Sequence, residues 1–255
     1  FLNKMNRFFL TIEYDGANFI GWQKQNTGPS IQECVEKAVE SFTNSKIILY
    51  GAGRTDAGVH ASGQVAHLDL PNKFSSYQIM EAINAHLINT KIKIINVQLV
   101  KKEAHARFSA LWRKYRYFIL NRQAPPAINQ GYVWHQKITL DIEKMKVASK
   151  YLIGTHDFSS FRATHCQSKS AVKTLDQISI IKKKESIVIT VKARSFLHHQ
   201  VRNIVGSLKL VGCGKWEPEY IVEVMNKKNS TAAGPTAPAA GLVLTEIKYP
   251  QKVYL

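Results

Sequence analysis

Short stretches in which apolar and polar residues alternate mark out the expected strands of this chain. Phe8, Leu10, Ile12 and Tyr14 occupy every second position, so they fall on one face of an extended segment. Comparable runs predict further strands over residues 46–50, 64–70, 92–100, 114–120, 175–181 and 186–193. The last two are joined across "KKKE", which predicts an antiparallel hairpin.

Apolar residues at helical spacing mark out the expected helices. In "SIQECVEKAVESF", Ser30 and Glu33 have capping-box spacing, and Val35 and Val39 lie on one apolar stripe. Cys34 falls on the same stripe, which favours a core cysteine over a reactive thiol. Further helices are expected over residues 76–88, over 140–154 with Asp141 as the N-cap, over 196–212 and over 218–226.

The order of these elements is similar in the two halves of the chain: strand, helix, strand, strand, helix. This order predicts an α+β protein in which two halves pack together around a cleft. We place the boundary near residue 105, which gives an N-terminal half of residues 5–105 and a C-terminal half of residues 106–255. The first four residues, "FLNK", precede Met5 and are set aside. The composition of "TAAGPTAPAAG" indicates a loop and does not decide whether that loop is ordered.

Net charge says more about the class of binding partner than overall composition does. The 255 residues include 35 Lys and Arg against 18 Asp and Glu, a net charge of +17. Such a surplus indicates a polyanion, and nucleic acid is favoured over a merely solvated basic surface because the basic residues cluster near aromatics. Cys34, Cys166 and Cys213 lack CxxC spacing, which argues against disulfides and zinc. Nothing resembles a signal peptide or a membrane span, so we expect a cytoplasmic protein.

The stretch "YGAGRTDAGVHASGQVAH" places a carboxylate, Asp56, in a loop rich in glycine. An acid in a loop is more often a turn former or a helix cap. Here Arg54 lies two residues away, and Gly51, Gly53 and Gly58 carry no side chains that would block a ligand. A nucleotide-binding loop is disfavoured, because Asp56 replaces the third glycine of G-x-G-x-x-G and a Walker motif is absent. Asp56 is therefore a candidate catalytic residue.

A second segment, "ARFSALWRKYRYFIL", interleaves basic and aromatic residues. The pattern is typical of a half-buried strand, which accounts for Tyr117, and it also suits stacking of Tyr115 on an RNA base. We expect phosphate contacts from five basic residues in and beyond this segment: Arg107, Arg113, Lys114, Arg162 and Lys169.

A third segment, "RSFLHHQVRNIVG", carries Arg202 beside the buried stripe of its expected helix. A helix-flank arginine is usually solvated, yet this position also suits pairing with an acid such as Asp56. The adjacent His198 and His199 would point about 100° apart on a helix, which argues against joint metal binding.

In its ordered motifs the chain resembles the TruA-type tRNA pseudouridine synthases. The motifs are "YDGANFIGWQKQ", "SIQE", "GAGRTDAGVHASGQVAH", "ARFSA", "KYRYFI", "HDFSSFRA", "FLHHQVRNIVG" and "APAAGLVL", and they span nearly the whole chain. The resemblance implies the pseudouridine synthase fold, with two RRM-like α/β halves around a central mixed or antiparallel sheet and a basic cleft. It also implies an isomerase that converts uridine to pseudouridine at positions 38, 39 and 40 of the tRNA anticodon stem-loop. Such enzymes use no cofactor or essential metal, and they are homodimers in which one tRNA touches both subunits.

The same resemblance implies a role for each matching residue. Asp56 matches the nucleophilic aspartate, Arg202 the arginine that pairs with it, and Tyr115 the tyrosine that stacks on the target base. Leu242 matches the leucine of the uracil pocket, and Arg54 resembles the residue that helps to extrude the target nucleotide.

The chemistry accounts for a carboxylate at this place. Moving the attachment of uracil from N1 to C5 needs the glycosidic bond broken, the base turned and a carbon–carbon bond made. A carboxylate can serve as a nucleophile toward the sugar or the base, or as a base at C2′, once the uridine is flipped out of its stack. The main alternative is an inactive RNA-binding protein of the same fold, which would be expected to have lost one of Asp56, Tyr115 and Arg202. One departure from the family pattern, Gln200 in place of an apolar residue, concerns local packing.

Overall fold

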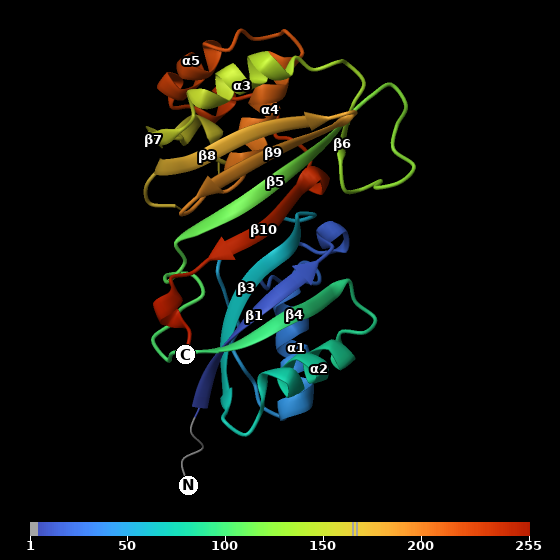
Figure 1. The fold of residues 1–255 in the computed structure, drawn as a ribbon, viewed down its shortest axis with the longest axis vertical. Coiled ribbons are helices and arrows are strands. Elements are labelled where there is room, and N and C mark those ends of the chain that lie inside the picture. Colours follow the sequence, from blue (N-terminus) through green and yellow to red (C-terminus); the bar gives the residue numbers. More distant parts are fainter. Residues whose placement is uncertain (1–4, 165, 167) are drawn as a thin grey trace. The chain divides into compact units, whose positions relative to one another are not determined.

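The computed structural model describes residues 5–164, 166 and 168–255, so the four residues before Met5 lie outside it. Two compact units make up the chain (Figure 1). Unit 1 holds the described residues up to Leu111 together with Leu244–Leu255, and unit 2 holds Trp112–Val243. The sequence prediction instead divides the chain near residue 105 and assigns the last residues to the second half. The two divisions differ because nothing in the local composition signals that the final segment returns to the first unit.

Unit 1 is built around β1 (Met5–Tyr14), which pairs antiparallel with β3 (His60–Pro71) and with β4 (Ile92–Val100). The short β2 (Tyr50–Gly51) also pairs with β3, and β10 (Leu242–Lys248) follows β3 in the strand order. The helices α1 (Ile31–Thr43) and α2 (Ser76–His86) pack on each other, and α2 packs along β4.

The alternation predicted for β1 is confirmed, since Phe8, Leu10, Ile12 and Tyr14 are all buried. The Ser30 side chain accepts a hydrogen bond from the Glu33 N–H at 3.3 Å, which confirms the predicted helix start.

The strand predicted over residues 46–50 is wrong except at its last residue, which begins β2. Side chains of α1 replace the partner strand here. The N–H of Leu49 donates to Glu36 Oε1 at 3.0 Å, and its carbonyl accepts from Gln32 Nε2 at 3.1 Å. Because the backbone is satisfied in this way, buried Leu49 contributes to the core without belonging to a sheet. Cys34 is half-buried, so it lies at the margin of the core and not within it.

Unit 2 begins with β5 (Trp112–Asn121), which pairs antiparallel with β9 (Ser186–Ala193) and parallel with β6 (Trp134–Gln136). β9 pairs antiparallel with β8 (Val172–Lys183), and β8 with β7 (Gly154–Asp157). The hairpin predicted across "KKKE" is therefore confirmed.

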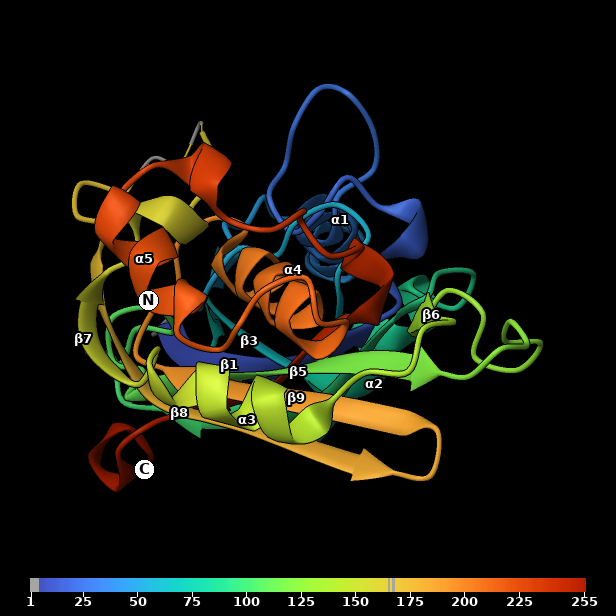
Figure 2. The same ribbon diagram turned by 90° about the horizontal axis from the view of Figure 1, so that it is seen from above.

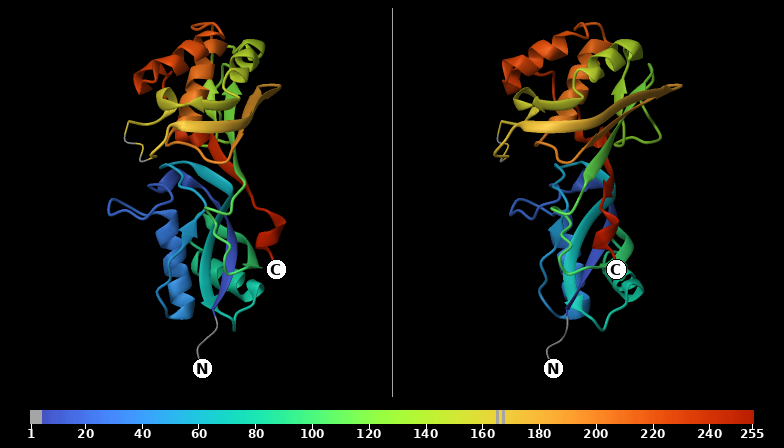
Figure 3. Two further views of the ribbon diagram at one scale, coloured as in Figure 1. Left: turned by 90° about the vertical axis from the view of Figure 1, so that its left-hand side faces the viewer. Right: turned by 60° about the vertical axis from the view of Figure 1, so that its left-hand side comes forward.

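The helices of unit 2 are α3 (Ile142–Lys150), α4 (Gln200–Gly212) and α5 (Tyr220–Lys227), and α3 packs on both α4 and β8. Figures 2 and 3 show them on one side of the strands of this unit. The Asp141 side chain accepts from the Lys144 N–H at 3.0 Å and caps α3, as predicted. Antiparallel strands with helices in each unit confirm the α+β class. Within the described ranges, no helix combines the length and the apolar character that crossing a membrane would require.

Candidate active site

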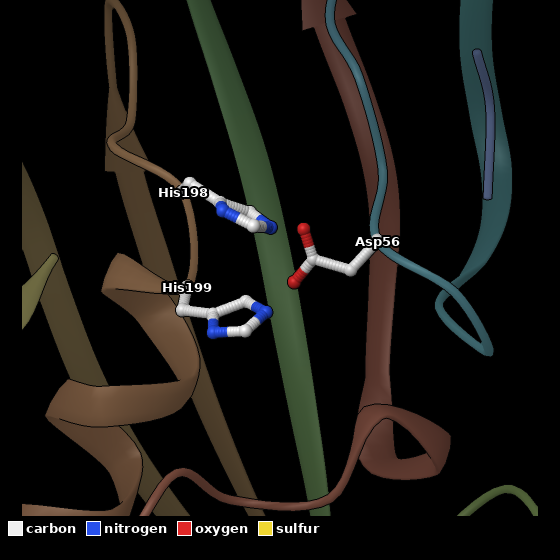
Figure 4. Close-up of side chains that lie close together, drawn as sticks. All are labelled: Asp56, His198 and His199. Atoms are coloured by element: carbon white, nitrogen blue, oxygen red, sulfur yellow. The ribbon is translucent and has the colours of Figure 1, made fainter. Parts of the chain in front are cut away.

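Asp56 lies in the loop that joins β2 to β3 in unit 1, and neighbouring residues of this loop differ in exposure. Arg54 is exposed, Thr55 is buried at 6% exposure and Asp56 is half-buried. Figure 4 shows the Asp56 carboxylate projecting from the loop backbone. The loop is therefore anchored inward at Thr55, and the charged side chains on either side of this anchor reach solvent in full or in part.

Thr55 is held through both its side chain and its backbone. Its Oγ1 lies 2.8 Å from the hydroxyl oxygen of Tyr14, at the end of β1, and either hydroxyl can be the donor. Its carbonyl accepts a hydrogen bond from the N–H of Trp22 at 3.1 Å. Because Thr55 immediately precedes Asp56, these contacts fix the backbone from which the carboxylate extends.

Gln64 in β3 supplies a second anchor, and its side chain has no exposure to solvent. Its Nε2 donates to the carbonyl of Gly53 at 2.9 Å, and its Oε1 accepts from the N–H of Val65 at 3.1 Å. Burial raises the pKa of Tyr14 despite the opposing influence of the Thr55 and Gln64 side chains, so this hydroxyl stays protonated at neutral pH.

The motif "YDGANFIGWQKQ" packs its backbone directly on that of the Asp56 loop. Gly21 has a φ of +109°, and a Cβ there would lie 2.6 Å from the Thr55 carbonyl oxygen. A Cβ on Gly16 would lie 2.1 Å from the carbonyl oxygen of Val59, at the end of the loop. Both contacts require glycine, which explains in physical terms why this motif accompanies the Asp56 motif.

Arg202 lies in the first turn of α4 in unit 2 and is half-buried. Its Nε donates to the carbonyl of Ala237 at 2.7 Å, and its own carbonyl accepts from the Ala237 N–H at 3.2 Å. The guanidinium and the backbone of this arginine are therefore each hydrogen bonded to the segment that leads into Leu242.

That segment, the Pro- and Gly-rich loop whose order the composition leaves open, is folded against α4. A Cβ on Gly206 would lie 1.7 Å from the carbonyl oxygen of Pro235, so helix and loop backbones touch. Ser207 Oγ accepts from the N–H of Gly234 at 2.9 Å, and Thr236 Oγ1 donates to Asn203 Oδ1 at 2.6 Å. Side chains of α4 thus order the loop.

Tyr115 and Tyr117 lie on the same strand, β5, and have different surroundings. Tyr117 is fully buried, its hydroxyl donates to the carbonyl of Pro238 at 2.8 Å, and burial raises its pKa. The interpretation of Tyr117 as a core residue is confirmed. Tyr115 is half-buried, and its ring meets that of Phe196 edge to face, with centroids 5.2 Å apart. Leu242, 5% exposed, begins β10 directly after the loop that Tyr117 anchors.

The helix predicted to begin at residue 196 begins at Gln200, so its predicted start is wrong. His199 has a φ of +62°, a left-handed conformation that cannot continue a helix backward. His198 and His199 consequently do not diverge as helical neighbours would, and their ring centroids lie 4.1 Å apart (Figure 4). The predicted divergence of the two rings is therefore wrong, and it no longer argues against joint metal binding.

Gln200 has a local explanation. Its side chain is 1% exposed, and its Oε1 accepts from the N–H of Leu197 at 2.8 Å. Its Nε2 has no hydrogen-bond partner among the residues that the structure describes. An apolar residue here would leave the Leu197 N–H without this acceptor. Glutamine satisfies that N–H but leaves its own Nε2 without a hydrogen-bond partner among the described residues.

The five basic residues predicted to contact RNA fall in different environments. Arg107 and Lys169 are exposed, and Lys114 and Arg162 are half-buried. The Arg107 guanidinium lies 5.6 Å from the Phe108 ring centroid, and Lys114 Nζ lies 5.0 Å from that of Trp112. Arg113 is 8% exposed and donates through Nη1 to the carbonyl of Arg194. We therefore do not assign Arg113 a contact with RNA.

Sequence reasoning missed Tyr14, Thr55 and Gln64. All three stand inside motifs that carry the family resemblance, yet Tyr14 continues an apolar alternation and Gln64 begins a run that predicts a strand. The sequence carries no direct signal for these residues, because only the structure shows that Gln64 is fully buried and so requires a polar partner.

The comparison with family models matches this arrangement to one class of enzyme. A model described as tRNA pseudouridine synthase matches residues 10–109 and 148–250, which include Asp56, Arg202 and Leu242 but not the segment that carries Tyr115. The chain therefore belongs to the tRNA pseudouridine synthase family, and it is an isomerase. The pseudouridine synthase fold expected from the sequence is confirmed by this membership.

Curated relatives specify the family further. The chain is 50% identical over 245 residues to tRNA pseudouridine synthase A of Paramagnetospirillum magneticum, and the match covers 96% of each chain. It is also 50% identical to tRNA pseudouridine synthase A of Rhodospirillum centenum, over 96% of this chain and 100% of the relative. For the enzyme of the same name from Anaplasma phagocytophilum the identity is 47%, over 95% and 100%.

Proposed function

We propose that this chain converts uridine to pseudouridine at positions 38, 39 and 40 of the tRNA anticodon stem-loop, with Asp56 as the nucleophile. The observation that carries this proposal is the construction of the Asp56 loop. A half-buried carboxylate follows a threonine whose side chain and backbone are both fixed. The family membership supplies the class of reaction, and the relatives' names supply tRNA as the substrate.

The proposed reaction balances without a co-reactant. The C1′–N1 bond of uridine breaks, a C1′–C5 bond forms, and the proton lost from C5 is matched by one gained at N1. Asp56 provides a transient covalent partner while the uracil turns, either at the sugar or at the base. The uridine must leave its stack first, and the exposed guanidinium of Arg54 is suited to filling the place that it vacates.

We assign the remaining roles by the same reasoning. Arg202 pairs with the Asp56 carboxylate and keeps it ionised, Tyr115 stacks on the target uracil, and Leu242 lines its pocket. Four basic side chains, Arg107, Lys114, Arg162 and Lys169, contact tRNA phosphates. The enzyme acts as a cytoplasmic homodimer on each tRNA, and light scattering of the purified protein should give twice the mass of one chain.

Release of tritium from tRNA that carries [5-³H]uridine tests the reaction, since the C5 hydrogen leaves as a proton. We expect wild-type protein to release tritium and Asp56→Asn to release none while it still binds tRNA. Asp176→Asn, which neutralises an exposed carboxylate on β8, is the matched control and should be fully active. Turnover by Asp56→Asn would refute the nucleophile assignment, and inactivity of the wild type would support an RNA-binding protein instead. Mapping pseudouridine in the product tRNA tests positions 38, 39 and 40.

A further inference from the structure

Tyr14, Thr55 and Gln64 form a buried polar network behind the Asp56 loop. Their exposures are 2%, 6% and 0%. The Tyr14 hydroxyl shares a hydrogen bond with Thr55 Oγ1, and the Gln64 side chain, which lies near that hydroxyl, donates to the carbonyl of Gly53. Side chains from the two paired strands β1 and β3 thus hold the loop at Thr55, just before Asp56, and at Gly53, three positions before it.

Burial alone does not call for these polar groups. Phe8, Leu10 and Ile12 fill the same face of β1 with apolar side chains, so a phenylalanine in place of Tyr14 would continue the pattern. Buried polar networks are no more stabilising than apolar packing of the same shape, but when every group is satisfied they specify one arrangement. What this network specifies is the path of the backbone from Gly53 to Asp56.

We infer that Tyr14, Thr55 and Gln64 are positioning residues that hold the Asp56 carboxylate at its place of attack. This inference rests on the proposed function, since it presumes that Asp56 reacts. Displacement of a reacting group by about 1 Å can lower a rate by a factor of about 100. Loss of the network should therefore lower kcat and leave the binding of tRNA, which involves other side chains, nearly unchanged.

A pair of substitutions at Thr55 isolates the hydroxyl. Thr55→Val keeps the branched shape and loses Oγ1, whereas Thr55→Ser keeps the hydroxyl and loses a methyl group. We expect kcat for tritium release to fall roughly 10- to 100-fold in Thr55→Val and to stay within about threefold of wild type in Thr55→Ser. The KM and the Kd for tRNA should change less than about twofold in both variants. A network with only a structural role would make both variants less stable and would give no such difference in kcat.

Tyr249 provides a matched control for Tyr14 within unit 1. It is also buried, at 4% exposure, and its hydroxyl donates to the carbonyl of Ala106 at 2.6 Å, away from the Asp56 loop. Tyr14→Phe and Tyr249→Phe should lower the urea midpoint to a similar extent, because each loses a buried hydroxyl hydrogen bond. Only Tyr14→Phe should lose kcat, by at least about tenfold.

Asp56→Asn in the same assay separates the two levels of the proposal. If Asp56→Asn is inactive but Tyr14→Phe and Thr55→Val turn over as fast as Tyr249→Phe, the positioning role is wrong and the nucleophile assignment stands. If Asp56→Asn is active, the proposed function fails and the positioning role fails with it. A Tyr14→Phe variant that does not fold leaves the decision to the Thr55 pair, in which equal kcat values for valine and serine would refute the inference.

Discussion

Arg202 and Ala237 exchange two hydrogen bonds, one from the guanidinium Nε of Arg202 and one to its backbone carbonyl. The Nε bond uses the inner edge of the guanidinium and leaves the outer nitrogens to other contacts. Lysine has no atom equivalent to Nε, so it would lose this bond even though it keeps the positive charge.

We therefore predict that Arg202→Lys and Arg202→Ala both lower kcat by at least about tenfold. The decrease in kcat should be larger for Arg202→Ala, because this variant also loses the positive charge. The Kd for tRNA should change far less, because many cations share phosphate binding. Lys209→Ala, in the last turn of the same helix, is the control and should keep full turnover. Single-turnover kinetics and filter binding measure the two effects. Near-normal turnover of Arg202→Ala would show that another group keeps Asp56 ionised, and Arg54 would be tested next.

Tyr117 should matter for stability. Its hydroxyl donates to the carbonyl of Pro238 from a fully buried ring, and phenylalanine would leave that carbonyl without this donor. We expect Tyr117→Phe to lower the free energy of unfolding by about 1–3 kcal/mol, measured by urea denaturation. Tyr77→Phe, at an exposed position of α2, serves as the reference and should change it by less than about 0.5 kcal/mol. Equal stabilities of the two variants would contradict the role of the Tyr117 hydroxyl.

His67 should stay neutral well below physiological pH. Burial, followed by the nearby His105 and Arg7, lowers the pKa of His67 to about 4. Its Nδ1 accepts from the N–H of Ala106 at 3.2 Å, and Tyr50 stacks on its ring at a centroid distance of 4.9 Å. NMR titration of the His67 ring protons should therefore show no midpoint near 6.5.

The depressed pKa of His67 also sets the sign of a stability change. The unfolded chain takes up a proton near pH 6.5 and the folded chain only near pH 4, so stability falls as the pH decreases through this window. For this one group the slope cannot exceed about 1.4 kcal/mol per pH unit. His67→Phe should remove this contribution, so the urea midpoint should depend less on pH between pH 6.5 and pH 4.5. An unchanged slope would mean that other groups, such as His105, dominate.

Binding of tRNA should weaken steeply with salt. Each phosphate contact adds roughly 0.7 to 0.9 to the slope of log affinity against log salt. Lys169→Ala and Arg107→Ala, at exposed positions, should each lower the slope by about one contact. Arg113→Ala should instead destabilise the fold and leave the slope unchanged, because this side chain is buried and its guanidinium donates to the carbonyl of Arg194, directly after β9. A flat salt profile would indicate that the basic surplus is merely solvated.

Local pattern was sufficient wherever the neighbouring residues determine the structure. The alternation from Phe8 to Tyr14, the Ser30 cap and the "KKKE" hairpin all depend on contacts between residues close in sequence, or on simple burial. The predicted start of α4 is wrong because His199 adopts a left-handed conformation that the apolar spacing does not signal. The strand predicted over residues 46–50 is too long because side chains of α1 satisfy the backbone of Leu49.

For the candidate site, the sequence identified the charged residues and missed what holds them. Asp56 and Arg54 stand out because charges are unusual among glycines. Thr55 and Gln64 are ordinary residue types. Only the structure shows that Thr55 shares a hydrogen bond with Tyr14, about forty residues earlier in the chain, and that Gln64 donates to the Gly53 carbonyl of the loop. Roles that depend on such distant partners cannot be read from spacing along one chain.

The return of residues 244–255, which include most of β10, to unit 1 has a consequence for synthesis on the ribosome. Residues up to Leu111 emerge first, yet the strand that follows β3 in their sheet order is translated only after all of unit 2. Until then the edge of β3 lacks its final neighbour, and an open strand edge invites pairing with other chains. A nascent chain that is stalled before Leu242 should accordingly be cut by protease within residues 5–111 and become resistant there once residues 242–248 have emerged. Resistance before that point would show that the first unit matures without its last strand.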